Sequence, residues 1–162
     1  MKLYLKQQPL SFRDRFSVRD ESDREVLTVE GEIFSWGHKL HLFDQKDKEV
    51  AVIRQEVLSF RPRFSIEIGG REVGRAIQRF TLIGTQFDID GLDWSAEGSF
   101  DAHEFTVFDK RRTIMEVRKA WFSWGDSYEL DIAQSDDALS AVCVLLAIDL
   151  ALETQAGKGL LP

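Results

Sequence analysis

The sequence predicts a mainly β protein with one long α-helix, in which about twelve antiparallel strands form a closed barrel around a buried hydrophobic C-terminal helix. Over most of the chain, short runs of β-branched and aromatic residues alternate with polar residues, and turn residues recur every ten to sixteen positions. That pattern is typical of an antiparallel meander. Near the C-terminus the alternation stops, and the segment 138–152 contains only two polar side chains.

The strands are predicted from short runs that are rich in β-branched and aromatic residues, such as those at 26–29, 49–58 and 64–68. Between the runs lie residues that favour tight turns, because Gly and Asp accept the backbone angles that a hairpin requires. The turn signals are Asp20 to Arg24, Asp44 to Lys48, Gly69-Gly70, Asp90-Gly91 and Asp109 to Arg112. The tetrapeptide FSWG occurs at 34–37 and again at 122–125, which predicts repeated hairpin units within one barrel.

The C-terminal segment is predicted to be a helix over about residues 137–153. Its residues ALSAVCVLLAIDLAL favour a helix, and they are apolar except for Ser140 and Asp149. Residues 135–137, Ser-Asp-Asp, place a capping side chain and negative charge before it. The glycine-containing stretch 156–159 is expected to end the helix.

A helix that is apolar on every side needs apolar surroundings on every side. This one is too short to cross a bilayer comfortably, and Asp149 interrupts it. The preceding strands must therefore surround it, and closing the sheet also removes exposed strand edges. We expect one domain over 1–153 and a short flexible tail over 154–162.

The composition excludes several classes of protein. Twelve Phe and four Trp in 162 residues exclude disorder over most of the chain, and a net charge of −7 argues against nucleic-acid binding. The only cysteine, Cys143, cannot form an intramolecular disulfide, and no signal peptide or transmembrane stretch is evident. We expect a cytoplasmic protein, peripheral at the membrane if it binds lipid, with no cofactor.

Several segments resemble the LURP-one-related family, whose bacterial members are labelled YxjI-like. The most specific of them is WFSWGDSYELDI at 121–132; the AIDL of the helix (147–150), LSFRPRF (58–64) and WSAEG (94–98) fit the same pattern. The resemblance implies the fold of the C-terminal domain of Tubby proteins and of phospholipid scramblases, a twelve-stranded barrel around a hydrophobic helix. It implies no settled activity.

No motif in the sequence requires a reaction. GxSxG, GxGxxG and GxxxxGK[ST] are absent, and Cys143 lies among apolar helix residues, where its thiol should be unreactive. His38 and His41 lie three apart, a spacing that places them on opposite faces of a strand, so we expect no shared metal. We expect no enzymatic activity. The alternative is a hydrolase with a polar site at the barrel rim around Asp101 and His103.

Asp149 stands out, because a carboxylate buried without a partner costs several kcal/mol. We expect it to lie near the barrel mouth. Our hypothesis is that it pairs with an arginine or a backbone donor and so holds the helix in place.

Clusters of basic residues are the main indication of function. They occur at every fourth position of one strand, on either side of Pro62, and at a hairpin tip. The candidate anion-binding residues are Arg61, Arg63, Arg71, Arg75, Arg79, Lys110, Arg111 and Arg112. Basic residues on the barrel bind phosphoinositide headgroups in the Tubby relatives, so the resemblance favours an anionic phospholipid or membrane surface, or else a protein, as partner. We expect the aromatic residues Trp121, Phe122 and Trp124 to cover one end of the barrel or to pack on the helix. The alternative is that they are exposed and insert at a lipid interface or anchor a partner.

Overall fold

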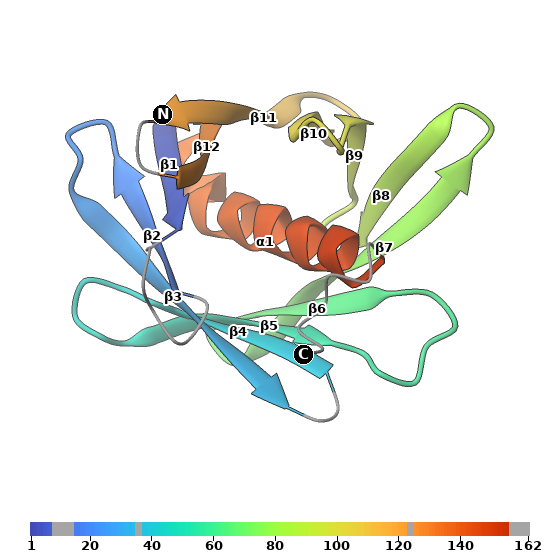
Figure 1. Ribbon diagram of the computed structural model, residues 1–162, viewed down its shortest axis with the longest axis horizontal. Helices are drawn as coiled ribbons and strands as arrows, with labels where there is room; N and C mark the ends of the chain where they lie inside the picture. The colour runs from blue at the N-terminus through green and yellow to red at the C-terminus, as the bar shows by residue number, and fades with distance from the viewer. Residues whose placement is uncertain (8–14, 35–36, 123–124, 156–162) are drawn as a thin grey trace.

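The computed structural model describes residues 1–7, 15–34, 37–122 and 125–155, and these form a closed barrel with a helix inside it (Figure 1). The strands are β1 (Lys2–Gln7), β2 (Arg15–Asp20), β3 (Glu25–Phe34), β4 (Gly37–Phe43), β5 (Glu49–Gln55), β6 (Arg63–Ile68), β7 (Arg71–Thr81), β8 (Gly84–Asp90), β9 (Trp94–Ser99), β10 (Glu104–Phe108), β11 (Thr113–Phe122) and β12 (Gly125–Ile132). A 3₁₀ turn, Ser135–Asp137, leads into helix α1 (Ala138–Gln155).

The twelve strands follow one another around the barrel in chain order, and each pairs antiparallel with the next. The sheet closes where β1 pairs with β12, with Leu3 opposite Leu130. The prediction of a closed antiparallel barrel is therefore confirmed. The two FSWG segments each join a pair of neighbouring strands, β3 to β4 and β11 to β12.

Helix α1 runs through the middle of the barrel (Figure 1), and it is buried from Ala141 to Ile148 without interruption. The strands meet it with their inward-facing side chains, of which Phe64 on β6 and Phe87 on β8 are fully buried. The helix continues to Gln155, two residues beyond the predicted end. Two bonds hold that last turn: the Thr154 hydroxyl donates to the Leu150 carbonyl (2.8 Å), and Gln78 Nε2 of β7 donates to Gln155 Oε1 (2.9 Å).

The two ends of the barrel have different loops. Because consecutive strands are antiparallel neighbours, the positions where one strand follows another alternate between the two ends. One end, which we name the polar end, carries the turns at 20–25, 44–48, 69–70, 90–93 and 109–112. These five turns are the ones that the sequence predicts. Gly69 (φ 60°) and Gly70 (φ 78°) have the angles of a primed turn, as expected.

At the opposite end, β5 stops three residues earlier than predicted. The apolar run to Leu58 suggested a strand over 49–58, but β5 ends at Gln55. Val57 and Leu58 instead lie in the β5–β6 loop, where Val57 is half exposed and Leu58 is fully exposed. The physical reason is that β6 pairs with β5 only as far as Gln55, opposite Phe64, so no neighbouring strand extends the ladder.

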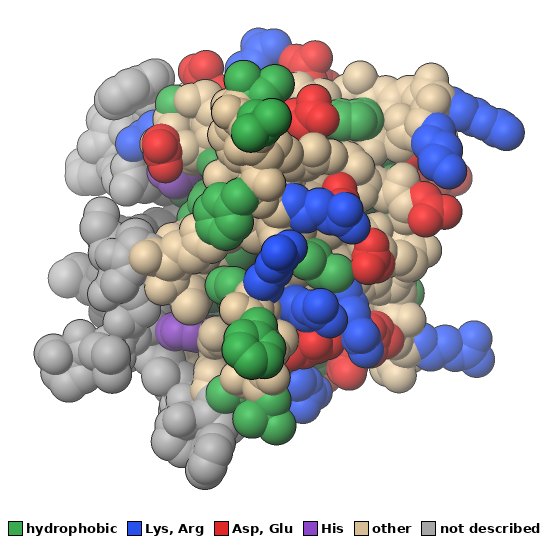
Figure 2. Space-filling view, turned by 90° about the vertical axis from the view of Figure 1, so that its right-hand side faces the viewer, with side chains coloured by type: hydrophobic (Ala, Val, Ile, Leu, Met, Phe, Trp, Pro, Cys, Tyr) green, Lys and Arg blue, Asp and Glu red, His purple; other side chains and the backbone are tan. Residues whose placement is uncertain are grey.

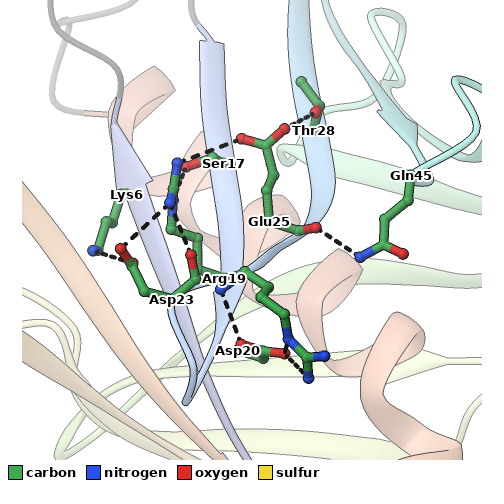
Figure 3. Close-up of polar contacts among 9 residues, drawn as sticks. Lys6, Ser17, Arg19, Asp20, Asp23, Glu25, Thr28 and Gln45 are labelled. Carbon is green, nitrogen blue, oxygen red and sulfur yellow. Dashed lines mark hydrogen bonds and ion pairs between the residues drawn. The ribbon is translucent and has the colours of Figure 1, made fainter.

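Three turns of the polar end are built around an aspartate. The Asp20 carboxylate accepts the backbone N–H groups of Arg24 (3.0 Å) and Ser22 (2.8 Å). Asp44 and Asp109 each accept two backbone N–H groups in the same way. Figure 3 shows the side chains around the first of these turns, where Lys6 and Arg19 both reach Asp23.

The turn aspartates predict that the stability of the fold depends on pH in the acidic range. Hydrogen bonds from backbone N–H groups lower the pKa values of Asp20, Asp44 and Asp109. A carboxylate whose pKa is lower in the folded state stabilises that state above the unfolded pKa of about 3.9, and this contribution is lost as the pH falls below it. We expect the triple variant Asp20→Asn, Asp44→Asn, Asp109→Asn to lose less unfolding free energy between neutral and acidic pH than the unaltered chain. Urea denaturation at a series of pH values measures this.

The control is the double variant Asp93→Asn, Asp101→Asn, which changes two exposed carboxylates that accept no hydrogen bond from the residues that the structure describes. It should keep the acid dependence of the unaltered chain. An equally steep loss in the triple variant would show that the turn carboxylates do not carry the effect.

Candidate functional site

Four of the eight predicted basic residues lie at the polar end. Arg71 begins β7 beside the Gly69-Gly70 turn, and Lys110, Arg111 and Arg112 lie at the β10–β11 turn. Arg112 Nη1 donates to Asp137 (2.7 Å), the residue before α1, and this hydrogen bond raises the pKa of Arg112. Arg112 therefore links a barrel turn to the start of the helix.

Two more of the predicted residues lie along β7 and are held by carboxylates. Arg75 Nε lies 2.5 Å from Glu72 and 3.0 Å from Glu56, and these contacts raise the pKa of Arg75. Arg79 pairs with Asp88 on the neighbouring strand β8. Their positive charge is thus largely compensated within the barrel wall.

The remaining two, Arg61 and Arg63, lie together at the end opposite the polar end. With Glu56, Leu58, Ser59 and Phe60 they line an open hollow of about 410 Å³ in the β5–β6 loop. Neither arginine forms an ion pair with any residue that the structure describes. The Nε of Arg63 is buried and has no hydrogen-bond partner among those residues.

The loop that forms the hollow is braced from within. The Ser59 hydroxyl contacts the carbonyls of Glu56 (3.1 Å) and Arg61 (2.5 Å), and Glu56 N–H donates to the Arg63 carbonyl (2.9 Å). The Glu56 carboxylate is engaged by Arg75, so it compensates the two arginines less. The hollow is therefore a preformed and locally positive surface, suited to an anion.

Large hydrophobic side chains project from the same end. Leu58 and Phe60 of the β5–β6 loop, and Leu82 and Ile83 of the β7–β8 turn, are each at least 99% exposed. Figure 2 views this side of the molecule and shows hydrophobic side chains interspersed with Lys and Arg. The sequence pattern did not indicate this feature, because the apolar run that ends at Leu58 resembles the end of a strand.

A small polar cluster lies between the helix and the wall. The Tyr128 hydroxyl lies 3.2 Å from Asp149 Oδ1 and 3.2 Å from His103 Nδ1, and the rings of Tyr128 and His103 meet edge to face. His103 is thus connected to Asp149. Asp101 is exposed and has no hydrogen bond to His103 among the described contacts. One partner of Asp149 is therefore a phenol, a kind of donor that our hypothesis of an arginine or a backbone donor did not include.

The other candidate groups offer little chemistry. His38 and His41 both lie on β4, and His41 bonds through its two ring nitrogens to Glu32 and Glu49 (2.7 Å each). Within the described part of the chain, no group of three His, Cys, Asp or Glu side chains could hold a metal ion. Burial raises the pKa of Cys143 to about 12, so its thiol stays protonated. The side chains of Trp121, Phe122 and Trp124 lie outside the described residues.

The polar cluster predicts how Tyr128 stabilises the fold. We expect Tyr128→Phe to lower the free energy of unfolding by about 1–3 kcal/mol, because Asp149 loses a hydrogen-bond donor on an apolar helix. Adding Asp149→Leu should recover part of that loss, since the helix then carries no carboxylate deprived of its Tyr128 donor, while the contact between Tyr128 and His103 stays lost. Chemical denaturation of the two single variants and the double variant measures the coupling. A Tyr128→Phe variant as stable as the unaltered chain would contradict this role.

Comparison with known proteins bears on the family and the fold. The model of the LURP-one-related family matches residues 1–149. The uncharacterized protein YxjI of Bacillus subtilis is 36% identical over 152 residues, which cover 94% of each chain. A solved structure of a protein from Arabidopsis thaliana superposes with a TM-score of 0.62 at 13% identity, covering 91% of this chain and 90% of that one.

These comparisons agree with the architecture described above. The Arabidopsis structure supports the fold alone, because the sequence identity is low. No helix in the described part of the chain is long and apolar enough to span a membrane. From the match to the family model and the identity with YxjI, we conclude that this chain belongs to the LURP-one-related family.

Proposed function

We propose that this protein is a non-enzymatic binding module that binds an anionic phospholipid headgroup in the hollow of the β5–β6 loop. The observation that carries the proposal is that Arg61 and Arg63 lack carboxylate partners in the described part of the chain. Both line a preformed hollow without an ion-pair partner among the described residues, and the Nε of Arg63 is a buried donor without an acceptor. Because no carboxylate among the described residues forms an ion pair with them, the two guanidinium groups can pair with the oxygens of a bound phosphate.

The charge distribution supports local recognition. The chain carries a net charge of −7, so its overall field repels an anionic surface. Binding must therefore come from a few arginines at close range, where screening by salt is weakest. Arginine suits this role, because its planar guanidinium binds phosphate oxygens in pairs.

Support for a hydrolase is weaker. The alternative site joined Asp101 and His103, but Asp101 is exposed and His103 is bonded to Tyr128 instead. The unreactive Cys143 offers no nucleophile. With its single cysteine, the chain suits a reducing compartment, and we place the module at the cytoplasmic face of a membrane.

Co-sedimentation with vesicles tests the proposal. We expect binding to vesicles of phosphatidylcholine with phosphatidylserine, little binding to phosphatidylcholine alone, and weaker binding as salt increases. The double variant Arg61→Gln, Arg63→Gln should bind about thirtyfold more weakly, because each cationic residue at an anionic surface contributes about 1 kcal/mol.

The matched control is Arg71→Gln, Arg111→Gln, which removes the same charge from the polar end. The polar end is at the opposite end of the barrel, farther from the membrane-bound hollow than the Debye length of about 8 Å at physiological salt. The control should therefore bind like the unaltered chain. Equal losses in the two double variants would mean that net charge, and not the hollow, determines binding. If the unaltered chain does not bind the vesicles that contain phosphatidylserine, the proposal is refuted.

A further inference from the structure

We infer that the two loops beside the hollow insert their apolar tips into the same anionic membrane, so that the barrel stands on its end with the polar end away from the bilayer. This inference rests on the proposed function and adds the docking surface and its orientation. The docking surface consists of two apolar tips: Leu58 and Phe60 of the β5–β6 loop, and Phe80, Leu82 and Ile83 of the β7–β8 hairpin.

The β7–β8 hairpin projects beyond the barrel wall. Strand β6 pairs with β7 only as far as Ile77, and β9 pairs with β8 only from Gln86. The hairpin between these positions has no neighbouring strand on either side, and Figure 1 shows it extending past the end of the helix. Its tip can therefore enter a lipid bilayer without disturbing the strand pairing of the barrel.

The turn residues themselves are unusual for their place. Two-residue hairpin turns favour Asn, Asp and Gly, whereas this turn, closed by the pairing of Thr81 with Gly84, consists of Leu82 and Ile83. The five turns of the polar end follow the usual preference with Asp and Gly. Exposing two aliphatic side chains to water is unfavourable in free energy, so their presence points to an apolar environment at this tip.

The surrounding charge identifies that environment as a lipid surface. Both tips follow strands that run in the same direction, β5 and β7, so they lie at one end of the barrel on either side of β6. Arg61 and Arg63 lie beside the first tip. Apolar tips flanked by basic residues are the pattern of proteins that enter the interface of an anionic membrane.

Other occupants fit less well. A fluid bilayer accepts two separate projections, whereas a protein partner would need a surface shaped to both. A second copy of the chain meeting this end symmetrically would bring the same arginines against one another. Among the described residues, the turns of the polar end expose no large hydrophobic side chain, so the apolar tips set the orientation.

A fluorescent probe at the tips tests the insertion. Cys143 is buried with its pKa raised to about 12, so an introduced cysteine is labelled selectively. An environment-sensitive dye on Phe60→Cys or Ile83→Cys should shift to the blue on anionic vesicles and be quenched by spin-labelled lipid. The same dye on Lys46→Cys, in the β4–β5 turn of the polar end, should show neither effect.

Affinity supplies the second readout. The variant Leu82→Ser, Ile83→Ser should bind anionic vesicles about a hundredfold more weakly, because burying each large aliphatic side chain changes affinity by about tenfold or more. Its thermal unfolding should match that of the unaltered chain, since both side chains are fully exposed.

The outcomes separate the two proposals. If the unaltered chain binds no anionic vesicles, both the proposed function and this inference fail. If it binds in a salt-sensitive way while the tip probes stay in water and the serine variant binds equally well, the headgroup proposal survives and the insertion is refuted. Sedimentation velocity without lipid supplies one further outcome. If the unaltered chain is a dimer and the serine variant is a monomer, the tips bind a second copy of the chain, and the inference is overturned.

Discussion

The burial of helix α1 on all sides is the constraint on which the rest of the structure depends. The helix has no polar side from which it could face water, and its residues from Ala141 to Ile148 are buried without a break. A flat sheet could cover only one side of it. The antiparallel sheet therefore closes around the helix, with Leu3 of β1 opposite Leu130 of β12, and the side chains that face inward become a single core.

Because the barrel is closed, its two ends are where the loops can differ from one another in sequence and structure. Hairpin connections send alternate turns to opposite ends, so each end can evolve without disturbing the core. The polar end uses aspartates that bind their own backbone and hold the strands in register. The other end carries the hollow of Arg61 and Arg63 and the apolar tips, whose large hydrophobic side chains are exposed and not packed into the core. Function is therefore to be sought at that end.

The sequence predicts the barrel, the helix and the five polar turns because these depend on local chemistry: alternation, helix propensity, and Asp or Gly in turns. It could not separate Arg61 and Arg63 from Arg75 and Arg79, because the ion pairs of the β7 arginines depend on which carboxylates neighbouring strands bring beside them. The link from Tyr128 to the helix joins residues distant in the sequence, and no local pattern signals it. Apolar residues in a turn, such as Leu58, resemble a strand until the neighbouring strand is known to end.

Amide hydrogen exchange of the chain, free and bound to anionic vesicles, tests the central claim that α1 serves as the core while one end of the barrel meets the membrane. We expect the amides of 138–155 to exchange slowly in both states, and the amides of 56–62 and 80–84 to become more protected when the chain binds vesicles. A loss of protection in the helix on vesicle binding would contradict it, because the barrel would then have opened to release its core.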